Sequence, residues 1–283
     1  MTAIAYKRVG IAIAVPALWL SGLGAAAPAR PAVQAPAPVA PPAASPPSAT
    51  PAEDVPVLNV TVIARHPHDS SAFTEGLAFA DGMLFESTGL EGRSEVRRVT
   101  LAGRIVARKA IPPRDFGEGL ALWRKQIVTL TWHGGIAHRW NARTLKPEGQ
   151  ARYTGEGWGL AAKGDTLALS DGSATSKFYD AASFRQTGRI TVTYRGRPLD
   201  QINELEYVDG ALLANVWHSA FLVRIDPATG RVTAVIDLNP LVTEVAARDP
   251  EAVPNGIAWD ARGRRLFVTG KLWPTLFEVR LPG

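Results

Sequence analysis

The phrase "EGLAF" at residues 75–79 is the first of five similar phrases that decide the fold. The others are "EGLAL" (118–122), "WGLAA" (158–162), "NELEY" (203–207) and "NGIAW" (255–259). Each phrase is followed by a hairpin signal and a second short run of alternating apolar and polar residues, and no long helical period intervenes. A unit that recurs about every 40 to 50 residues in this way indicates a repeat protein built from β-strands.

Two further strands complete most of the units. In the first unit, "SEVRRVTL" (94–101) and "RIVARKAI" (104–111) flank a turn at Ala102-Gly103, and in the fourth, "AFLVRID" (220–226) precedes "RVTAVIDL" (231–238). Four short antiparallel strands per repeat are typical of a β-propeller blade. The sequence therefore predicts an all-β fold, a five-bladed β-propeller.

The two ends of the chain complete the last blade. The fifth unit has a third strand, "TLFEVRL" (275–281), and then the chain stops at Gly283. We expect its missing outer strand to come from "VLNVTVIA" (57–64), since that pairing leaves no blade edge open. Residues 57–283 are thus predicted to form a five-bladed β-propeller domain closed by an N-terminal strand.

The first 56 residues are predicted to lie outside the propeller. Lys7 and Arg8 precede a short apolar run and the small residues 24–27, which is the order of a secretory signal peptide over residues 1–27. The run is shorter than the ~20 residues of a spanning helix, so cleavage is favoured over a membrane anchor, and membrane contact is expected only through the signal. Residues 28–56 are mainly Ala, Pro, Ser and Val and predict a disordered linker. We expect an exported protein, periplasmic or secreted.

Composition excludes several kinds of protein. The chain has no cysteine, so packing alone must stabilise an exported fold. Its five histidines lack a ligand spacing with carboxylate or thiolate partners, and we predict no metal and no cofactor. The formal net charge of +5, which loses two charges with the signal, is too small to indicate nucleic-acid binding. We expect a monomer.

One ring of positions differs between the repeats. The first strand of a blade lines the channel and the second runs back, so the start of one and the end of the other lie at the same mouth. The starts are Glu75, Glu118, Trp158, Asn203 and Asn255, and the ends are Gly89, Trp132, Gly172, Trp217 and Lys271.

This ring is predicted to be a site, because the neighbouring positions repeat Gly, Leu or Ile, and Ala while the ring holds acids, amides, indoles and an amine. The structural alternative is that propeller mouths are wet and that tryptophans pack between blades. Trp123, Trp140 and Trp259 lie off the ring and are expected in the core or at an interface between blades. In "GEGWGL" (155–160), Trp158 belongs to the ring, whereas Glu156 lies two residues outside it and is at most a supporting residue. Strand alternation places Glu204 on the opposite face from Asn203.

Eight phrases together resemble one family, the plant and bacterial type of glutaminyl-peptide cyclotransferase (glutamine cyclotransferase). They are "FTEGL", "FESTG", "FGEGL", "GEGWGL", "SDGS", "NELEY", "NVW" and "NGIA" with "FVTGKLWP", and they occur in order from Val57 to Leu281. The resemblance implies an acyltransferase that converts the N-terminal glutamine of peptides or proteins to pyroglutamate and releases ammonia. It also implies that zinc is not needed.

The resemblance implies an active site with Glu118, Lys271 and Asn203 as catalytic residues and Glu75, Trp132, Trp158 and Trp217 as substrate-binding residues. The substrate's α-amine attacks its own carboxamide, so no covalent enzyme residue is required. Glu118 is expected to take the amine's proton and deliver it to the departing ammonia. Lys271 and Asn203 would donate to the amide oxygen, the indoles would confine the glutamine side chain, and Glu75 would hold the ammonium or tune Glu118.

Two other functions remain open on the sequence. A non-catalytic propeller could bind a peptide or glycan through the same aromatic rim, and it would show binding without ammonia release. A metal-dependent propeller hydrolase or lactonase could use Glu75, Glu118, Asn203 and Asn255 as ligands, although Lys271 would repel its cation. Loss of activity on chelation would favour that second alternative.

Overall fold

The structure, a computed structural model, describes residues 54–282. The predicted signal peptide and nearly all of the predicted linker lie outside the described residues. Val55, assigned to the end of the linker, is buried and packs in the core, so the folded part already includes it. Within the described part, no helix has the length and apolarity to cross a membrane.

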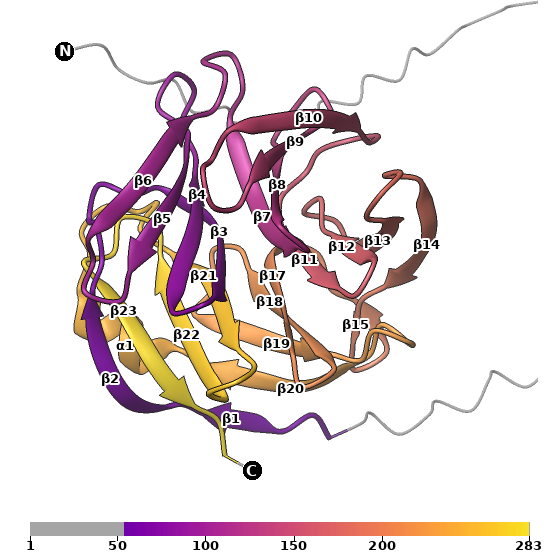
Figure 1. Cartoon of the computed structure of the whole chain (residues 1–283). Helices are drawn as coiled ribbons and strands as arrows, with labels where there is room; N and C mark the ends of the chain where they lie inside the picture. The colour runs from indigo at the N-terminus through magenta and orange to yellow at the C-terminus, as the bar shows by residue number, and fades with distance from the viewer. Residues whose placement is uncertain (1–53, 283) are drawn as a thin grey trace, which may run out of the picture. The chain divides into compact units, whose positions relative to one another are not determined.

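Five sheets form the blades of a propeller, as predicted (Figure 1). Blade one is β3 (Thr74–Ala80), β4 (Met83–Thr88), β5 (Glu95–Thr100) and β6 (Ile105–Ala110); blade two is β7 (Gly117–Trp123), β8 (Gln126–Thr131), β9 (Ile136–Asn141) and β10 (Pro147–Arg152). Blade three is β11 (Leu160–Lys163), β12 (Thr166–Leu169), β13 (Thr175–Asp180) and β14 (Gln186–Thr191). Blade four holds β17 (Ile202–Val208), β18 (Ala211–Val216), β19 (Phe221–Ile225) and β20 (Val232–Asp237); blade five holds β21 (Pro254–Asp260), β22 (Arg265–Gly270) and β23 (Thr275–Arg280).

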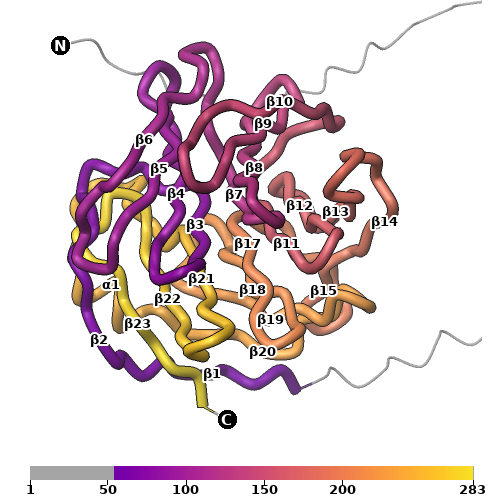
Figure 2. The backbone as a smooth tube through the Cα atoms, viewed as in Figure 1, coloured from indigo at the N-terminus to yellow at the C-terminus, as the bar shows by residue number. Residues whose placement is uncertain are grey.

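The inner strands β3, β7, β11, β17 and β21 pack side by side in chain order, and β21 packs against β3 to close the ring. Small elements fill the connections between blades: the ribbon β15 (Thr193–Tyr194) with β16 (Arg197–Pro198), and the short helix α1 (Asn239–Val245). Figure 2 traces the chain around this ring, with the first described residues beside the last.

The N-terminal segment closes two blades instead of one. β2 (Thr61–Pro67) pairs antiparallel with β23 as the predicted outer strand of blade five. The prediction of a single strand over 57–64 is wrong at its start, because β1 (Val57–Asn59) pairs parallel with β20 at the edge of blade four. Leu58, Val60 and Val62 all pack on one core cluster, so the alternation continues through the switch. Alternation fixes which face is apolar but not which edge receives the strand.

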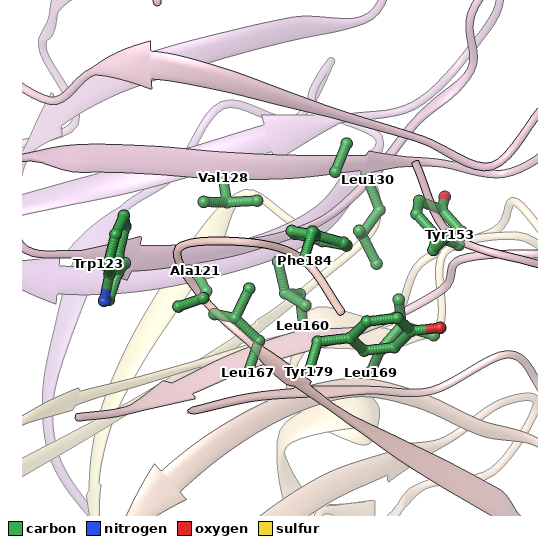
Figure 3. Packing of buried hydrophobic residues seen from close by; sticks show 12 residues of the cluster. Ala121, Trp123, Val128, Leu130, Tyr153, Leu160, Leu167, Leu169, Tyr179 and Phe184 are labelled. Atoms are coloured by element: carbon green, nitrogen blue, oxygen red, sulfur yellow. The ribbon is translucent and has the colours of Figure 1, made fainter. Parts of the chain in front are cut away.

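The core lies between neighbouring blades. Figure 3 shows one such cluster, in which Leu130 and Tyr153 from blade two face Leu160 and Leu169 from blade three. Trp123, also predicted to be a core residue, packs in the same cluster. Facing blades are therefore held by apolar contact, which leaves the polar ring residues to the channel mouth.

Candidate active site

The ring residues occupy β-bulges. In four blades the pairing of the inner strand shifts at the ring position, between Thr74 and Gly76, Gly117 and Leu120, Ile202 and Leu205, and Pro254 and Ile257. A bulge re-aims a side chain that regular alternation would place on a blade face. In blade three Trp158 does the same from a loop, since β11 begins only at Leu160.

A hydrogen bond joins each pair of neighbouring blades at the level of the ring. Three second strands donate to the next blade: Ser87 Oγ to Glu118 O at 2.5 Å, Ser170 Oγ to Asn203 O at 2.6 Å, and Asn215 Nδ2 to Pro254 O at 3.2 Å. The other two junctions are Gly119 N to Trp158 O at 2.7 Å and Asn255 Nδ2 to Thr74 O at 2.9 Å. These bonds place the ring positions of all five repeats at one mouth of the channel.

Two acids and a lysine meet there. Lys271 Nζ donates to Glu75 Oε1 at 2.7 Å, Asn255 Nδ2 donates to Glu75 Oε2 at 3.0 Å, and the Glu118 carboxyl is hydrogen-bonded to Glu75. Glu75 is 1% exposed and Glu118 and Lys271 are each 6% exposed. The three residues come from blades one, two and five and form one buried cluster.

Burial determines where the proton lies in this cluster. Burial raises the pKa of Glu75 to about 7, although Lys271 opposes the rise. The pKa of Glu118 is raised well above its ordinary value by burial and by the negative charge of Glu75. Because both pKa values are raised and each carboxylate disfavours the charge of the other, the pair favours a form that holds a proton.

An aromatic wall continues from this cluster. Lys271 Nζ lies 4.5 Å from the centre of the Phe73 ring, Phe73 meets Phe116 edge-on at 6.2 Å, and Phe116 meets Trp132 edge-on at 5.5 Å. Sequence reasoning assigned Trp132 but missed the two phenylalanines. Their signal was present, because each stands two residues before a ring acid, in "FTEGL" and "FGEGL".

The other two predicted tryptophans extend the wall. Trp158 and Trp217 meet edge-on with ring centres 5.4 Å apart. Trp132 and Trp158 both donate their indole N–H to Glu156 Oε2, at 2.8 and 2.9 Å. Glu156 therefore supports the ring from outside it, which is the most that the sequence analysis assigned to this residue.

Glycines at the strand ends make room for these rings. A Cβ on Gly172 would lie 2.6 Å from the Trp158 ring, and one on Gly89 would overlap the Phe116 ring. Such contacts require glycine, because the rings are large and fixed by their neighbours. The two ring positions that carry no side chain thus help to shape the site.

The phrase "GEGWGL" is a tight loop. Gly155 has a φ of +92°, a Cβ on Gly157 would overlap the Tyr153 hydroxyl, and one on Gly159 would overlap Asn203 O. The three glycines let the chain turn and approach its neighbours closely, which delivers Glu156 and Trp158 to the mouth. The phrase lacks the branched aliphatic residues of a packed strand because residues 155–159 form a loop, and β11 begins only at Leu160.

Asn203 lies next to this loop, because its backbone oxygen is the atom that a Cβ on Gly159 would overlap. Asn203 is 3% exposed, and its Oδ1 has no hydrogen-bond partner among the described residues. A buried oxygen without a hydrogen-bond partner costs folding free energy. A ligand that donates a hydrogen bond to Oδ1 would recover this free energy. Glu204 is fully buried and accepts from the backbone N–H of Leu77 and Ile257, at 3.3 and 2.9 Å, so it joins the inner strands of three blades.

In residues 54–282, no three His, Cys, Asp or Glu side chains are grouped as a metal ion would require. Glu75 is instead in contact with Lys271 and with Glu118. The arrangement offers a proton on a carboxyl, a cation, an amide and an apolar enclosure, which are the parts needed to move a proton and stabilise a developing oxyanion.

Comparison with known proteins identifies the family of the chain. Residues 35–281 match the family described as glutamine cyclotransferase. The chain is 38% identical over 227 residues to glutaminyl-peptide cyclotransferase of Arabidopsis thaliana, covering 78% of this chain and 71% of that protein. Its structure is similar to the crystal structure of Myxococcus xanthus glutaminyl cyclase, with a TM-score of 0.77 and 41% sequence identity, and the match covers 81% of this chain and 98% of the Myxococcus chain. The chain therefore belongs to the glutamine cyclotransferase family.

Proposed function

We propose that the protein is a glutaminyl-peptide cyclotransferase, which converts the N-terminal glutamine of peptides or proteins to pyroglutamate with release of ammonia. The observation that carries the proposal is the buried Glu75–Glu118 pair with Lys271, bordered by a wall of aromatic rings. Membership of the family and the similarity to a glutaminyl-peptide cyclotransferase and a glutaminyl cyclase support it.

The substrate supplies its own nucleophile. The α-amine has a pKa near ~8, and its free form attacks the carbonyl carbon of the side-chain carboxamide. A bond forms from the α-nitrogen to that carbon, and the bond from the carbon to the amide nitrogen then breaks. The enzyme must protonate the departing nitrogen and remove a proton from the new ring nitrogen.

Glu118 performs both proton transfers. Because burial and Glu75 keep it protonated, it first gives its proton to the leaving nitrogen, which departs as ammonia. The resulting carboxylate then takes a proton from the ring nitrogen and returns to its starting state. This order reverses the sequence-based expectation, in which Glu118 acts first as the base, and Glu75 tunes Glu118 from a position that is almost fully buried.

Lys271 and Asn203 stabilise the tetrahedral intermediate. Lys271 uses one N–H for Glu75 and has others for the oxyanion, and a preorganised donor of this kind contributes roughly 3 to 4 kcal/mol. The free Oδ1 of Asn203 accepts a substrate N–H while its amide donates. The rings of Trp132, Trp158 and Trp217 hold the glutamine side chain folded and keep water away.

A coupled ammonia assay with a glutamine-initiated peptide tests the proposal. Ammonia release should match the loss of one ammonia from the peptide by mass spectrometry. The same peptide with an acetylated N-terminus should not react, because its nitrogen is no longer a nucleophile. Saturable binding without ammonia would instead indicate a binding propeller, and loss of activity with a chelator would indicate a metal-dependent enzyme.

A further inference from the structure

One carboxylate oxygen joins two walls of the site. Glu156 Oε2 accepts the indole N–H of Trp132 at 2.8 Å and that of Trp158 at 2.9 Å. Trp132 directly follows β8 in blade two, whereas Trp158 precedes β11 in blade three. The bond pair therefore crosses a blade boundary and fixes the two rings relative to each other.

The charge of Glu156 suits this contact. An indole offers one donor and no acceptor, so the two N–H groups need an oxygen with two free lone pairs. An ionised carboxylate gives bonds about twice as strong as a neutral acceptor does. The other oxygen, Oε1, lies 3.6 Å from His133 Nδ1, and the His133 ring stacks on Trp132 with centres 4.2 Å apart. Trp132 is thus held at its N–H by Glu156 and on its face by His133.

The backbone also builds this arrangement. Gly157 N donates to Trp132 O at 3.3 Å and Trp158 N donates to Ser170 O at 2.9 Å, so the loop is tied to both blades on either side of Glu156. The glycines of the loop are required by close approaches to Tyr153 and Asn203, as described above. The position of the carboxylate is therefore set by the fold, although the side chain itself is about two-fifths exposed at the mouth.

We propose that Glu156 is a positioning residue of the enzyme, whose carboxylate locks the Trp132 and Trp158 indoles in the orientation that encloses the substrate's glutamine side chain. This inference rests on the proposed function. Without the carboxylate, Trp132 still touches Phe116 and Trp158 still touches Trp217. Neither contact fixes one indole against the other, so the enclosure becomes looser while the fold remains.

Glu156 also acts on Glu118 through its charge. Burial makes the largest contribution to the raised pKa of Glu118. The negative charges of Glu75 and Glu156 raise this pKa further, and the positive charge of Lys271 lowers it. Removing the charge of Glu156 should therefore lower the pKa of Glu118. The alkaline limb of kcat, where Glu118 loses its proton, should then move to lower pH.

The variants are Glu156→Gln, which keeps an acceptor oxygen without the charge, and Glu156→Leu, which removes both. The control is Glu91→Gln, which removes the same charge from an exposed residue in the loop that follows β4 at the same mouth. We expect Glu156→Leu to raise KM about tenfold with a smaller change in kcat, since a lost enclosure weakens binding of substrate and transition state alike. The KM of Glu156→Gln should lie between those of the wild type and Glu156→Leu. Both Glu156 variants should shift the alkaline limb of kcat to lower pH. The control should change neither KM nor the position of that limb.

The indole N–H signals in a nitrogen–proton NMR spectrum provide a readout that needs no activity. The chain has eight tryptophans, and the signals of Trp132 and Trp158 can be assigned from Trp132→Phe and Trp158→Phe. Glu156→Leu should move these two signals, and with them the signal of Trp217, whose ring meets Trp158 edge-on, and should leave the other indole signals in place. Unchanged signals, or moved signals with wild-type KM and pH profile, would overturn the role of Glu156. No ammonia release by the wild-type protein would contradict the proposed function instead.

Discussion

At the scale of single residues, the proton on Glu118 is the feature on which the proposed chemistry depends. Glu118→Gln keeps the shape of the side chain but can neither give nor take a proton. We expect kcat to fall by at least ~100-fold, the usual contribution of general acid–base catalysis, with little change in KM. Near wild-type ammonia release by a variant with an unchanged circular dichroism spectrum would refute the assignment.

Two neighbours of Glu118 should shift its pKa in opposite directions. The negative charge of Glu75 raises the pKa of Glu118 and the positive charge of Lys271 lowers it. The alkaline limb of kcat should therefore move to lower pH in Glu75→Gln and to higher pH in Lys271→Met. Profiles of kcat at saturating glutamine peptide measure both shifts, and shifts in the same direction would contradict the charge arrangement.

At the scale of elements, a buried charge network ties the start of blade one to the loop that carries Lys271. Glu86 on β4 contacts His68 at 3.1 Å and Arg97 on β5 at 2.9 Å, while His68 Nδ1 lies 2.6 Å from Trp273 O. Arg97 also pairs with Asp69 at 2.9 Å. The connection between β2 and β3 is thereby held against the segment that follows β22, and with it the Glu75–Lys271 contact.

Glu86→Gln should destabilise the protein by about 3 kcal/mol, because it leaves buried Arg97 and His68 without their shared carboxylate. Urea unfolding measures the effect. Glu95→Gln in the same blade is the control, since Glu95 pairs with the exposed Arg108 only at 3.7 Å and should cost less than about 1 kcal/mol. Equal effects of the two substitutions would show that the network is not stabilising.

The same network predicts an acid-sensitive fold. Burial opposes ionisation of Glu86, but His68 and Arg97 outweigh it and lower its pKa to about 2. The unfolded value is near ~4.3, so the stabilisation is complete above that pH and is lost as the pH falls toward 2. Unfolding free energies of the wild type should drop across this range, and those of Glu86→Gln should drop less.

At the scale of the whole molecule, the ring is closed by residues that precede the first complete blade. β2 covers the edge of blade five and β1 covers the edge of blade four. Their removal would expose unpaired strand edges and the apolar residues that Leu58 and Val62 cover. Closure is therefore a property of both ends of the described chain together.

Graded truncation tests this closure. Relative to a chain that begins at Asp54, one that begins at Val60 loses β1 and the buried Val55 and should unfold at a moderately lower temperature. A chain that begins at His68 also loses β2 and should unfold at a much lower temperature or aggregate. Melting curves and light scattering distinguish the three, and equal melting temperatures would show that the N-terminal strands do not close the ring.

Much of the fold and the site could be predicted from the sequence, because each repeat contains the same pattern of an inner strand, a hairpin turn and a second strand. The five phrases and their hairpins predicted the blades, and their differing end residues predicted the ring that brings Glu75 and Lys271 together. Phe73 and Phe116 were missed because apolar residues at a strand start look like core. The split of the N-terminal strand was missed because the alternation of apolar and polar residues shows which face of a strand is buried but not which neighbouring strand it pairs with.

By itself the sequence determined the repeat, and with it the fold, the order of the blades and the residue types at the mouth. Only the tertiary structure decided the ionisation of the acids and the roles of the outer residues. The pKa of Glu118 is raised because folding buries it beside Glu75, and Glu156 joins two indoles because a glycine loop places it between blades two and three. A repeat pattern is local information, whereas a pKa and a shared hydrogen bond depend on groups that are distant along the chain and meet only after folding.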